Sequence, residues 1–169
     1  SKVKTGRCSY QFACYDDGGM ISDGLLIRLT NDKFWFAQGD GHLFSWYKAH
    51  SINLDVEIKD PNVWVSQIQG PKSLKLLNKI IDEPLENKFN YFDWIETSIA
   101  CEKVIISRTG FTNELGWEIY LRPQNDSKKI GDLILSKGEE MGMILTASPG
   151  FRCRRIEAGL LSAGRDFTK

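Results

Sequence analysis

The side chains best suited to bind a metal ion are those of the cysteines and histidines: Cys8, Cys14, Cys101, Cys153, His42 and His50. No two cysteines have the two-residue separation typical of zinc-binding pairs, and neither histidine is near a cysteine in the sequence. A zinc site is therefore not expected. An even number of cysteines leaves a disulfide possible, but we favour reduced, mostly buried thiols in a cytoplasmic protein.

Charged side chains are balanced along the chain. Its 22 Lys and Arg residues match 22 Asp and Glu residues, and the basic ones are scattered, with the densest group at Arg152, Arg154 and Arg155. This pattern lacks the basic footprint of a nucleic-acid-binding protein. No apolar run approaches the roughly 20 residues that span a bilayer. A hydrophobic content of 41% is ordinary for a globular protein, so neither a nucleic-acid nor a membrane partner is expected.

The first part of the chain predicts a small antiparallel sheet followed by a helix. Residues 7–15, rich in aromatic and small side chains, indicate a strand, and Asp-Asp-Gly-Gly at 16–19 indicates a turn. Further strands are expected at residues 25–29 and 34–37, joined as a hairpin or meander. Asp40 is a plausible N-cap for the next helix.

The remainder mixes strands and helices. Strands are expected at residues 54–58, 63–68, 89–95, 102–107 and 117–121. One helix is expected to begin near Pro71 and another after a cap at Asn125 or Asp126, because apolar residues there recur at helical spacing. The fold class is α+β, and the β-α-β-β-β-α order favours a ferredoxin-like split β-α-β subdomain.

Three stretches resemble the glycine-cleavage T-protein (aminomethyltransferase) superfamily. Residues 68–73 (IQGPKS) match its "QGPK" turn, residues 107–120 (SRTGFTNELGWEIY) are similar to "SRTGYTGEDGFEIY", and residues 155–160 (RIEAGL) are similar to "RLEAG". Each is weak alone, but the three in this order are specific. With residues 18–23 (GGMISD), the resemblance covers essentially the whole chain.

The resemblance also implies how the domains are arranged. Family members are three-domain cloverleaves around a central folate pocket and extend beyond this chain at both ends. We expect residues 1–53 to be part of the first folate-binding domain, 54–147 to form the second domain, and 148–169 to be a helical return segment to the first. The chain is thus expected to be an internal fragment that is inactive by itself.

The resemblance assigns folate contacts to particular residues. Glu118 stands at the family's folate-binding glutamate, and a carboxylate can accept two hydrogen bonds from the amino-pyrimidine edge of tetrahydrofolate, although an exposed strand glutamate is the alternative. Arg155 matches an arginine beside the pocket, and its alternative is a surface ion pair. Phe111 replaces a tyrosine and keeps only its stacking. Trp117 either walls the pterin or packs in the core. Tyr10 is a further expected contact.

The turn at residues 18–23 departs from the family pattern. Glycine-cleavage enzymes carry two consecutive aspartates where this chain has Ser22 and Asp23, the two residues that we take as catalytic candidates. A hydroxyl cannot replace a carboxylate in handling protons or stabilising a cation. Aminomethyl transfer with release of ammonia needs that help. Methyl transfer from a sulfonium needs less, because its leaving group is a neutral thioether.

Two further stretches resemble the dimethylsulfoniopropionate demethylase branch. Residues 34–41 (FWFAQGDG), with the later Trp46, are similar to "FW-S-x-A-D-G-D", and residues 154–159 match "RRIEAG". Trp35 and Trp46 are candidate cation–π contacts for a cationic methyl donor, or else they pack within the first domain. The expected function is therefore tetrahydrofolate-dependent demethylation of a small donor.

Three other functions stay open. The protein could be an aminomethyltransferase of glycine cleavage, a folate-binding module without catalysis, or an inactive truncated paralogue. The "K-G-C-Y-x-G-Q-E" motif of the family's iron–sulfur-assembly relatives is absent from the sequence. Neither the methyl donor nor the oligomeric state can be deduced from the sequence.

Overall fold

The computed structural model describes residues 2–39, 41–85, 89–146 and 148–167. The chain divides into two compact units, one formed by residues 1–61 and 161–169 and the other by residues 62–160. The expected segments have boundaries at 53/54 and 147/148, whereas this division falls at 61/62 and 160/161. No helix in the described ranges is long and apolar enough to cross a membrane.

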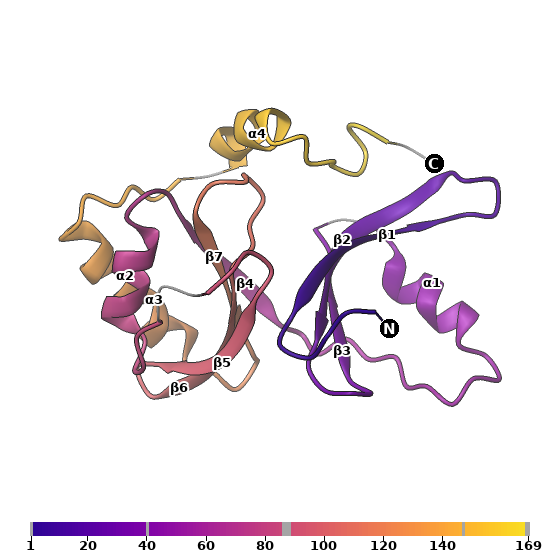
Figure 1. The fold of residues 1–169 in the computed structure, drawn as a ribbon, viewed down its shortest axis with the longest axis horizontal. Helices are drawn as coiled ribbons and strands as arrows, with labels where there is room; N and C mark the ends of the chain where they lie inside the picture. Colours follow the sequence, from indigo (N-terminus) through magenta and orange to yellow (C-terminus); the bar gives the residue numbers. More distant parts are fainter. Residues whose placement is uncertain (1, 40, 86–88, 147, 168–169) are drawn as a thin grey trace. The chain divides into compact units, whose positions relative to one another are not determined.

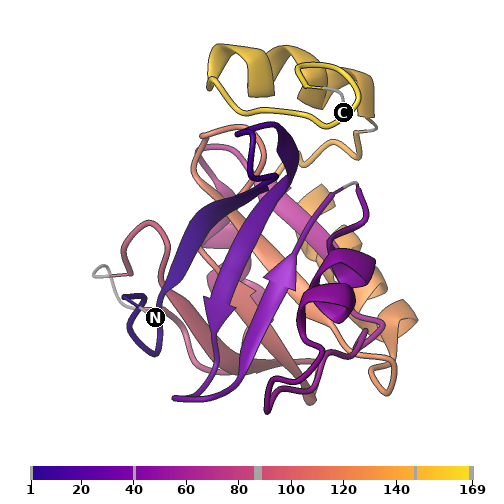
Figure 2. The ribbon, with the colours of Figure 1, turned by 90° about the vertical axis from the view of Figure 1, so that its right-hand side faces the viewer.

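The first unit is a three-stranded antiparallel sheet with one helix. Strands β1 (Cys8–Cys14), β2 (Met20–Arg28) and β3 (Phe34–Ala37) pair in the order β1-β2-β3, as the turn signals predict. Helix α1 (Leu43–His50) follows, beside β3 in Figure 2. The expected cap Asp40 lies outside the described residues. The residue that precedes α1, His42, makes no capping hydrogen bond through its side chain.

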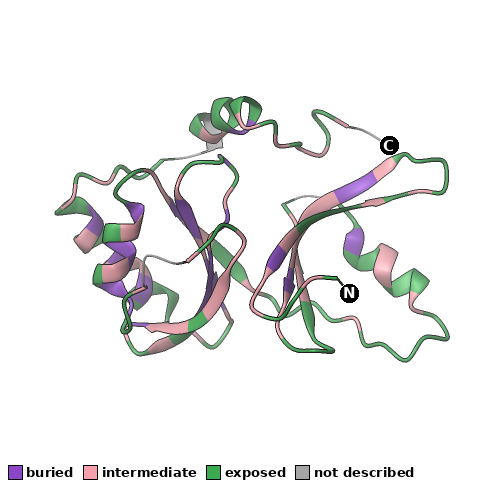
Figure 3. Cartoon of the chain, in the orientation of Figure 1, coloured by how far each residue is buried: buried purple, intermediate pink, exposed green. Residues whose placement is uncertain are grey.

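The second unit is a four-stranded antiparallel sheet covered on one face by two helices (Figure 1). Its strands are β4 (Trp64–Gln69), β5 (Trp94–Ile99), β6 (Glu102–Ser107) and β7 (Gly116–Leu121), in the order β4-β7-β6-β5. The helices are α2 (Ser73–Ile80) and α3 (Ser127–Glu139), and α4 (Ser148–Glu157) follows. The segments coloured purple in Figure 3 mark buried residues, which include many of α2, α3 and β7. With Ile99, Val104 and Ile106 of β5 and β6 they form the core of this unit.

The α+β class with antiparallel sheets is as expected, but the strand order differs from a split β-α-β unit. In a split unit, the strands before and after the helix are parallel, with one strand between them. Here β4 and β5 are the two edges of the sheet, and because every pairing is antiparallel, β4 and β5 run in opposite directions. The helix α2 therefore connects opposite edges of one antiparallel sheet.

Two expected strands differ from the structure. Residues 54–58 form no strand, and Leu54 and Val56 are exposed, because the alternating pattern there has no partner strand to pair with. The strand expected at 89–95 begins only at Trp94. The preceding residues turn instead, since the amide of Asn90 donates to the carboxylate of Asp93 over 2.6 Å.

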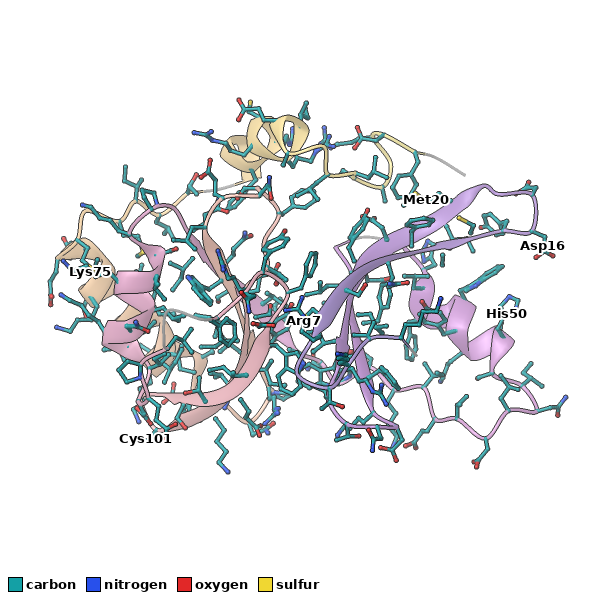
Figure 4. All side chains as sticks on the ribbon, in the orientation of Figure 1. Arg7, Asp16, Met20, His50, Lys75 and Cys101 are labelled. Atoms are coloured by element: carbon teal, nitrogen blue, oxygen red, sulfur yellow. The ribbon has the colours of Figure 1, made fainter. Side chains whose placement is uncertain are left out.

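The hairpin between β5 and β6 turns at two residues with left-handed backbone. Ala100 has φ 53° and Cys101 has φ 67°, a conformation that ordinarily favours asparagine and glycine. Cys101 lies at the tip of this hairpin in Figure 4 and is exposed, as are Cys14 and Cys153, while only Cys8 is buried. The expectation of mostly buried thiols is therefore wrong, because three of the four lie in exposed strand, turn or helix positions.

Candidate functional site

Strand β7 divides its side chains between the two faces of the second unit's sheet. Trp117, Ile119 and Leu121 belong to the core cluster that also contains the buried residues of α2 and α3. Because successive side chains of a strand alternate, Glu118 and Tyr120 lie on the opposite, helix-free face. The only carboxylate on β7 thus lies on the face that carries no helix of its own unit.

Glu118 is held by hydroxyl groups on this face. Thr109 donates from Oγ1 to Glu118 Oε2 over 2.5 Å, and the Tyr120 hydroxyl donates to the same oxygen over 3.1 Å. Ser107, paired directly opposite Glu118 in β6, forms a hydrogen bond with the Thr109 hydroxyl. Among the described residues, Glu118 Oε1 accepts no hydrogen bond from the protein. Both hydroxyl groups therefore hold one carboxylate oxygen, and no described residue donates to the other.

Burial governs the protonation of this carboxylate. Removal from water raises the pKa of Glu118, and the hydrogen bonds from Thr109 and Tyr120 oppose that rise. The pKa of Tyr91 is raised as well, first by burial and then by the negative charge of Glu118, while Arg108 acts in the opposite direction. Tyr91 therefore lies within electrostatic reach of the carboxylate.

A second set of polar side chains lies on β4, next to Glu118. Gln67 pairs directly opposite Glu118 and donates from Nε2 to Gln69 Oε1 over 3.0 Å. Thr112 donates to the same Gln69 oxygen over 2.5 Å. A Cβ atom added to Gly110 would lie 2.4 Å from Gln67 Nε2, so glycine lets the turn approach this amide. The two threonines of the T-G-F-T turn thus each hold one polar side chain of β4 or β7.

Trp117, expected either in a pterin wall or in the core, lies in the core. Its side chain is 1% exposed and packs against Phe89 with ring centroids 5.5 Å apart. It points to the face opposite Glu118, so the two side chains do not share a site, and the pocket-wall assignment is replaced by core packing. Phe111 lies exposed in the turn between β6 and β7, where its stacking role stays a prediction.

The structure separates the roles of two neighbouring arginines. Arg154 makes the surface ion pairs, 3.2 Å to Glu157 and 3.5 Å to Glu114. Arg155 is buried, and its Nη1 donates to the Leu160 carbonyl over 3.0 Å, just beyond the end of α4. The ion pair with Glu157 is thus made by Arg154, and the role of Arg155, contact with folate or an ion pair, stays a prediction.

In the first unit, the two catalytic candidates point in opposite directions. Ser22 and Asp23 are consecutive in β2, so their side chains lie on opposite faces of the sheet. Ser22 is fully buried, next to Gly41, whereas Asp23 accepts a 2.6 Å hydrogen bond from the Tyr10 hydroxyl. Partial burial and the Asp23 carboxylate together raise the pKa of Tyr10. Tyr10 and Asp23 form a hydrogen-bonded pair on one face of the sheet, and Ser22 lies on the other face.

The two tryptophan candidates are also apart. Trp46 packs edge-on against Tyr15 at 5.2 Å, and these two rings line a hollow of about 270 Å³ together with residues of β2 and the start of α1. Phe36 contacts Tyr47 of α1 at 5.8 Å, so strand alternation places the neighbouring Trp35 on the sheet face away from α1. The structure therefore does not form one cation-binding face from Trp35 and Trp46.

The sequence patterns did not single out five residues around Glu118: Thr109, Tyr120, Tyr91, Gln67 and Gln69. Three of them lie inside the motifs at residues 68–73 and 107–120, so the motifs were the available signal. Their roles depend on cross-strand pairing between β4, β6 and β7, which no local pattern reports.

Comparison with known proteins identifies the family. The family described as "GCVT N-terminal domain" matches residues 1–169. A trimethylamine-oxide aldolase of Ruegeria pomeroyi is 34% identical over 98% of this chain and 22% of its own length. An aminomethyltransferase of Clostridium botulinum (strain Kyoto / Type A2) is 32% identical over 98% of this chain and 46% of its own length.

Structural comparison agrees on the fold. A crystal structure of glycine cleavage system aminomethyltransferase T from Bartonella henselae superimposes with a TM-score of 0.85, at 21% identity, over 99% of this chain and 45% of that one. The chain spans about half the length of the aminomethyltransferases that it matches, and less of the aldolase. Because the family match extends over every residue, the chain belongs to the GCVT N-terminal domain family, the family of the glycine-cleavage T-protein.

Proposed function

We propose that the protein binds tetrahydrofolate on the Glu118 face and, as a whole protein, transfers a one-carbon group between a small donor and that folate. The observation that carries the proposal is the Glu118 carboxylate on the helix-free sheet face: its Oε2 accepts from Thr109 and Tyr120, and no described residue donates to its Oε1. Membership of a folate-dependent family supports the same ligand.

The hydrogen-bonding capacity of Glu118 fits the pterin ring. A carboxylate has about four lone-pair positions, and Thr109 and Tyr120 occupy two of them. About two acceptor positions remain, which is the number that the N–H groups of an amino-pyrimidine edge require. A lysine or a neutral side chain at this position would not complement that edge, so the residues present fit the ligand.

The chain's own residues would bind and orient the folate. Glu118 fixes the pterin edge, and Tyr91 supplies an aromatic ring near it. Tetrahydrofolate, once bound, supplies N5 as the acceptor of the one-carbon group. Placing that nitrogen in line with the donor carbon is the main contribution of the protein, because small misplacements lower the rate strongly.

We further propose that the group transferred is a methyl group from a sulfonium donor such as dimethylsulfoniopropionate. Ser22 stands where glycine-cleavage enzymes carry the first aspartate, and its hydroxyl is fully buried. Loss of a neutral thioether needs no proton donor, so a site without that carboxylate suits methyl transfer. Aminomethyl transfer is the second candidate, favoured by the 32% identity to an aminomethyltransferase.

Two experiments test these proposals on the whole protein. Calorimetric titration with tetrahydrofolate under reducing conditions is expected to show binding, and absence of binding would refute the folate proposal. Turnover is then compared with two donors. Formation of 5-methyltetrahydrofolate and methylthiopropionate from dimethylsulfoniopropionate supports the demethylase, whereas release of ammonia and methylenetetrahydrofolate from an aminomethyl-lipoyl carrier protein supports the second candidate.

A further inference from the structure

The hydroxyl groups behind Glu118 form a hydrogen-bond chain whose direction is set by chemistry. An ionised carboxylate can only accept, so the single hydroxyl proton of Thr109 is donated to Glu118 Oε2. The hydrogen bond between Ser107 and Thr109 must then carry the proton of Ser107. Ser107 and Thr109 are both buried, so water does not compete strongly for either group. The chain therefore runs from Ser107 through Thr109 to Glu118.

The same arrangement fixes the orientation of the carboxylate. Thr109 approaches Oε2 from the turn that follows β6, while Tyr120 approaches the same oxygen from β7 itself. Two donors from different segments hold one oxygen in place, which leaves rotation of the carboxyl group little freedom. The second oxygen, Oε1, is thereby kept as the acceptor that meets a ligand.

We propose that Thr109 is a positioning residue for folate recognition: its hydroxyl, supported by Ser107, holds the Glu118 carboxylate in the orientation in which it can accept the pterin N–H groups. This inference rests on the proposed function, because it needs Glu118 to contact folate. Thr109 itself need not touch the ligand. The next residue, Gly110, leaves room for the side-chain amide of Gln67, which a Cβ atom would contact.

A donated hydrogen bond stabilises the charged form of a buried carboxyl group. Burial raises the pKa of Glu118, and the Thr109 bond is the largest of the effects that lower it. The titratable groups near Glu118 are Tyr120 on its own strand and Tyr91 before β5, with Arg108 near Tyr91; β4 presents the uncharged Gln67 and β6 the uncharged Ser107. No lysine or arginine donates to the carboxylate in the described part of the chain.

The first experiment measures the pKa of Glu118 directly, without ligand, by carbon-13 NMR of its carboxyl group. Thr109→Val removes the hydroxyl at nearly constant shape, and we expect the pKa to rise. Thr109→Ser restores the donor and should return the pKa toward that of the unaltered protein. Thr112→Val is the matched control: it makes the same change in the same turn, but Thr112 donates to Gln69, so the pKa of Glu118 should stay unchanged.

The second experiment measures tetrahydrofolate affinity of the same variants by calorimetry at neutral pH. We expect Thr109→Val to weaken binding by about tenfold, the effect of one hydrogen bond to a charged group, and Thr109→Ser to recover most of it. Tyr120→Phe removes the other donor and should raise the pKa as well, which keeps the test available if Thr109→Val fails to fold.

The outcomes separate this inference from the proposed function. If the unaltered protein does not bind tetrahydrofolate, the proposed function fails, whatever the pKa values are. If it binds, but removing either donor changes neither the pKa of Glu118 nor the affinity, the positioning role of Thr109 is refuted while folate binding stands. A purely structural role would lower the melting temperature without moving the pKa.

Discussion

Replacing Glu118 by glutamine reverses the hydrogen-bonding character of the oxygen that faces the ligand. A glutamine side chain keeps the shape, but its carbonyl oxygen has about two acceptor positions. Thr109 and Tyr120, which both donate to Oε2 of the carboxylate, would occupy these two positions. The amide NH₂ group would then replace Oε1 and direct its hydrogens toward the pterin N–H groups, placing donor against donor.

The expected loss of affinity follows from that count. Two hydrogen bonds to a charged acceptor are lost, each worth about 1.5–3 kcal/mol, so a net loss of about 3 kcal/mol, or more than a hundredfold in Kd, is expected. Glu118→Ala should lose less, about 2 kcal/mol, because water can enter the space and accept from the ligand. We therefore expect the affinity for tetrahydrofolate to fall in the order glutamate, alanine, glutamine.

Calorimetric titration of the three proteins at neutral pH checks this order, with thermal melting as the measure of folding. The glutamine variant should melt at a temperature no lower than that of the unaltered protein, because burial raises the pKa of Glu118 and so disfavours its ionised form in the folded chain. Unchanged affinity of a folded glutamine variant would remove Glu118 from the binding site and refute the reasoning.

Three further predictions concern pH and stability. Because the pKa of Glu118 is raised above 4.5, tetrahydrofolate affinity should fall as the pH drops through that raised pKa. The contribution of Glu118 to folding stability has the opposite pH dependence: it is greatest at acidic pH and is lost as the pH rises through the raised pKa. Affinity and melting temperature measured across pH test both trends, and the Glu118→Gln variant, which cannot titrate at this position, should show neither. Gly24→Ala should destabilise the first unit by about 3 kcal/mol, because the added Cβ would lie 2.4 Å from a backbone carbonyl of β3. Gly131→Ala, whose Cβ would lie in open space on α3, should stabilise the second unit by about 1 kcal/mol. Urea unfolding measures both changes, and equal effects would contradict the packing argument. Combining Ala100→Asn with Cys101→Gly should raise the melting temperature by about 2–4 °C, because both positions have positive φ; a lower melting temperature would show that the side chains removed matter more than the turn.

Local patterns predicted most elements of the fold. The helical spacing of Leu74, Leu77 and Ile81 places α2 correctly. Asp126 caps α3 by accepting from the Lys129 amide over 3.0 Å. The strand expected at 54–58 fails because alternation reports only that a segment could be half-buried, not that a partner strand exists. The predicted strand order is wrong for the same reason, because β4 pairs with β7, a segment distant in the sequence that no local pattern identifies.

The site was predictable only where a motif contains it. Glu118 was found through its resemblance to a family signature, but Thr109 and Gln67 act through cross-strand geometry that becomes visible only when β4, β6 and β7 are in register. Strand alternation alone, by contrast, could have shown that Ser22 and Asp23 cannot both face one site. Their grouping came from the motif and not from the geometry of a strand.

The position of β4 at the edge of its sheet has a consequence for folding during synthesis. Its only partner in the described sheet is β7, and the pairing joins Trp64 to Leu121 and Gln69 to Gly116. The ribosome therefore releases β4 well before its partner exists, whereas β5, β6 and β7 form a local meander. Local contacts form faster than distant ones, so the meander should gain amide protection first and β4 should join last. Until β7 emerges, Trp64 and Val65 belong to an unpaired strand. During this interval the nascent chain is most open to binding by chaperones and to association with other chains.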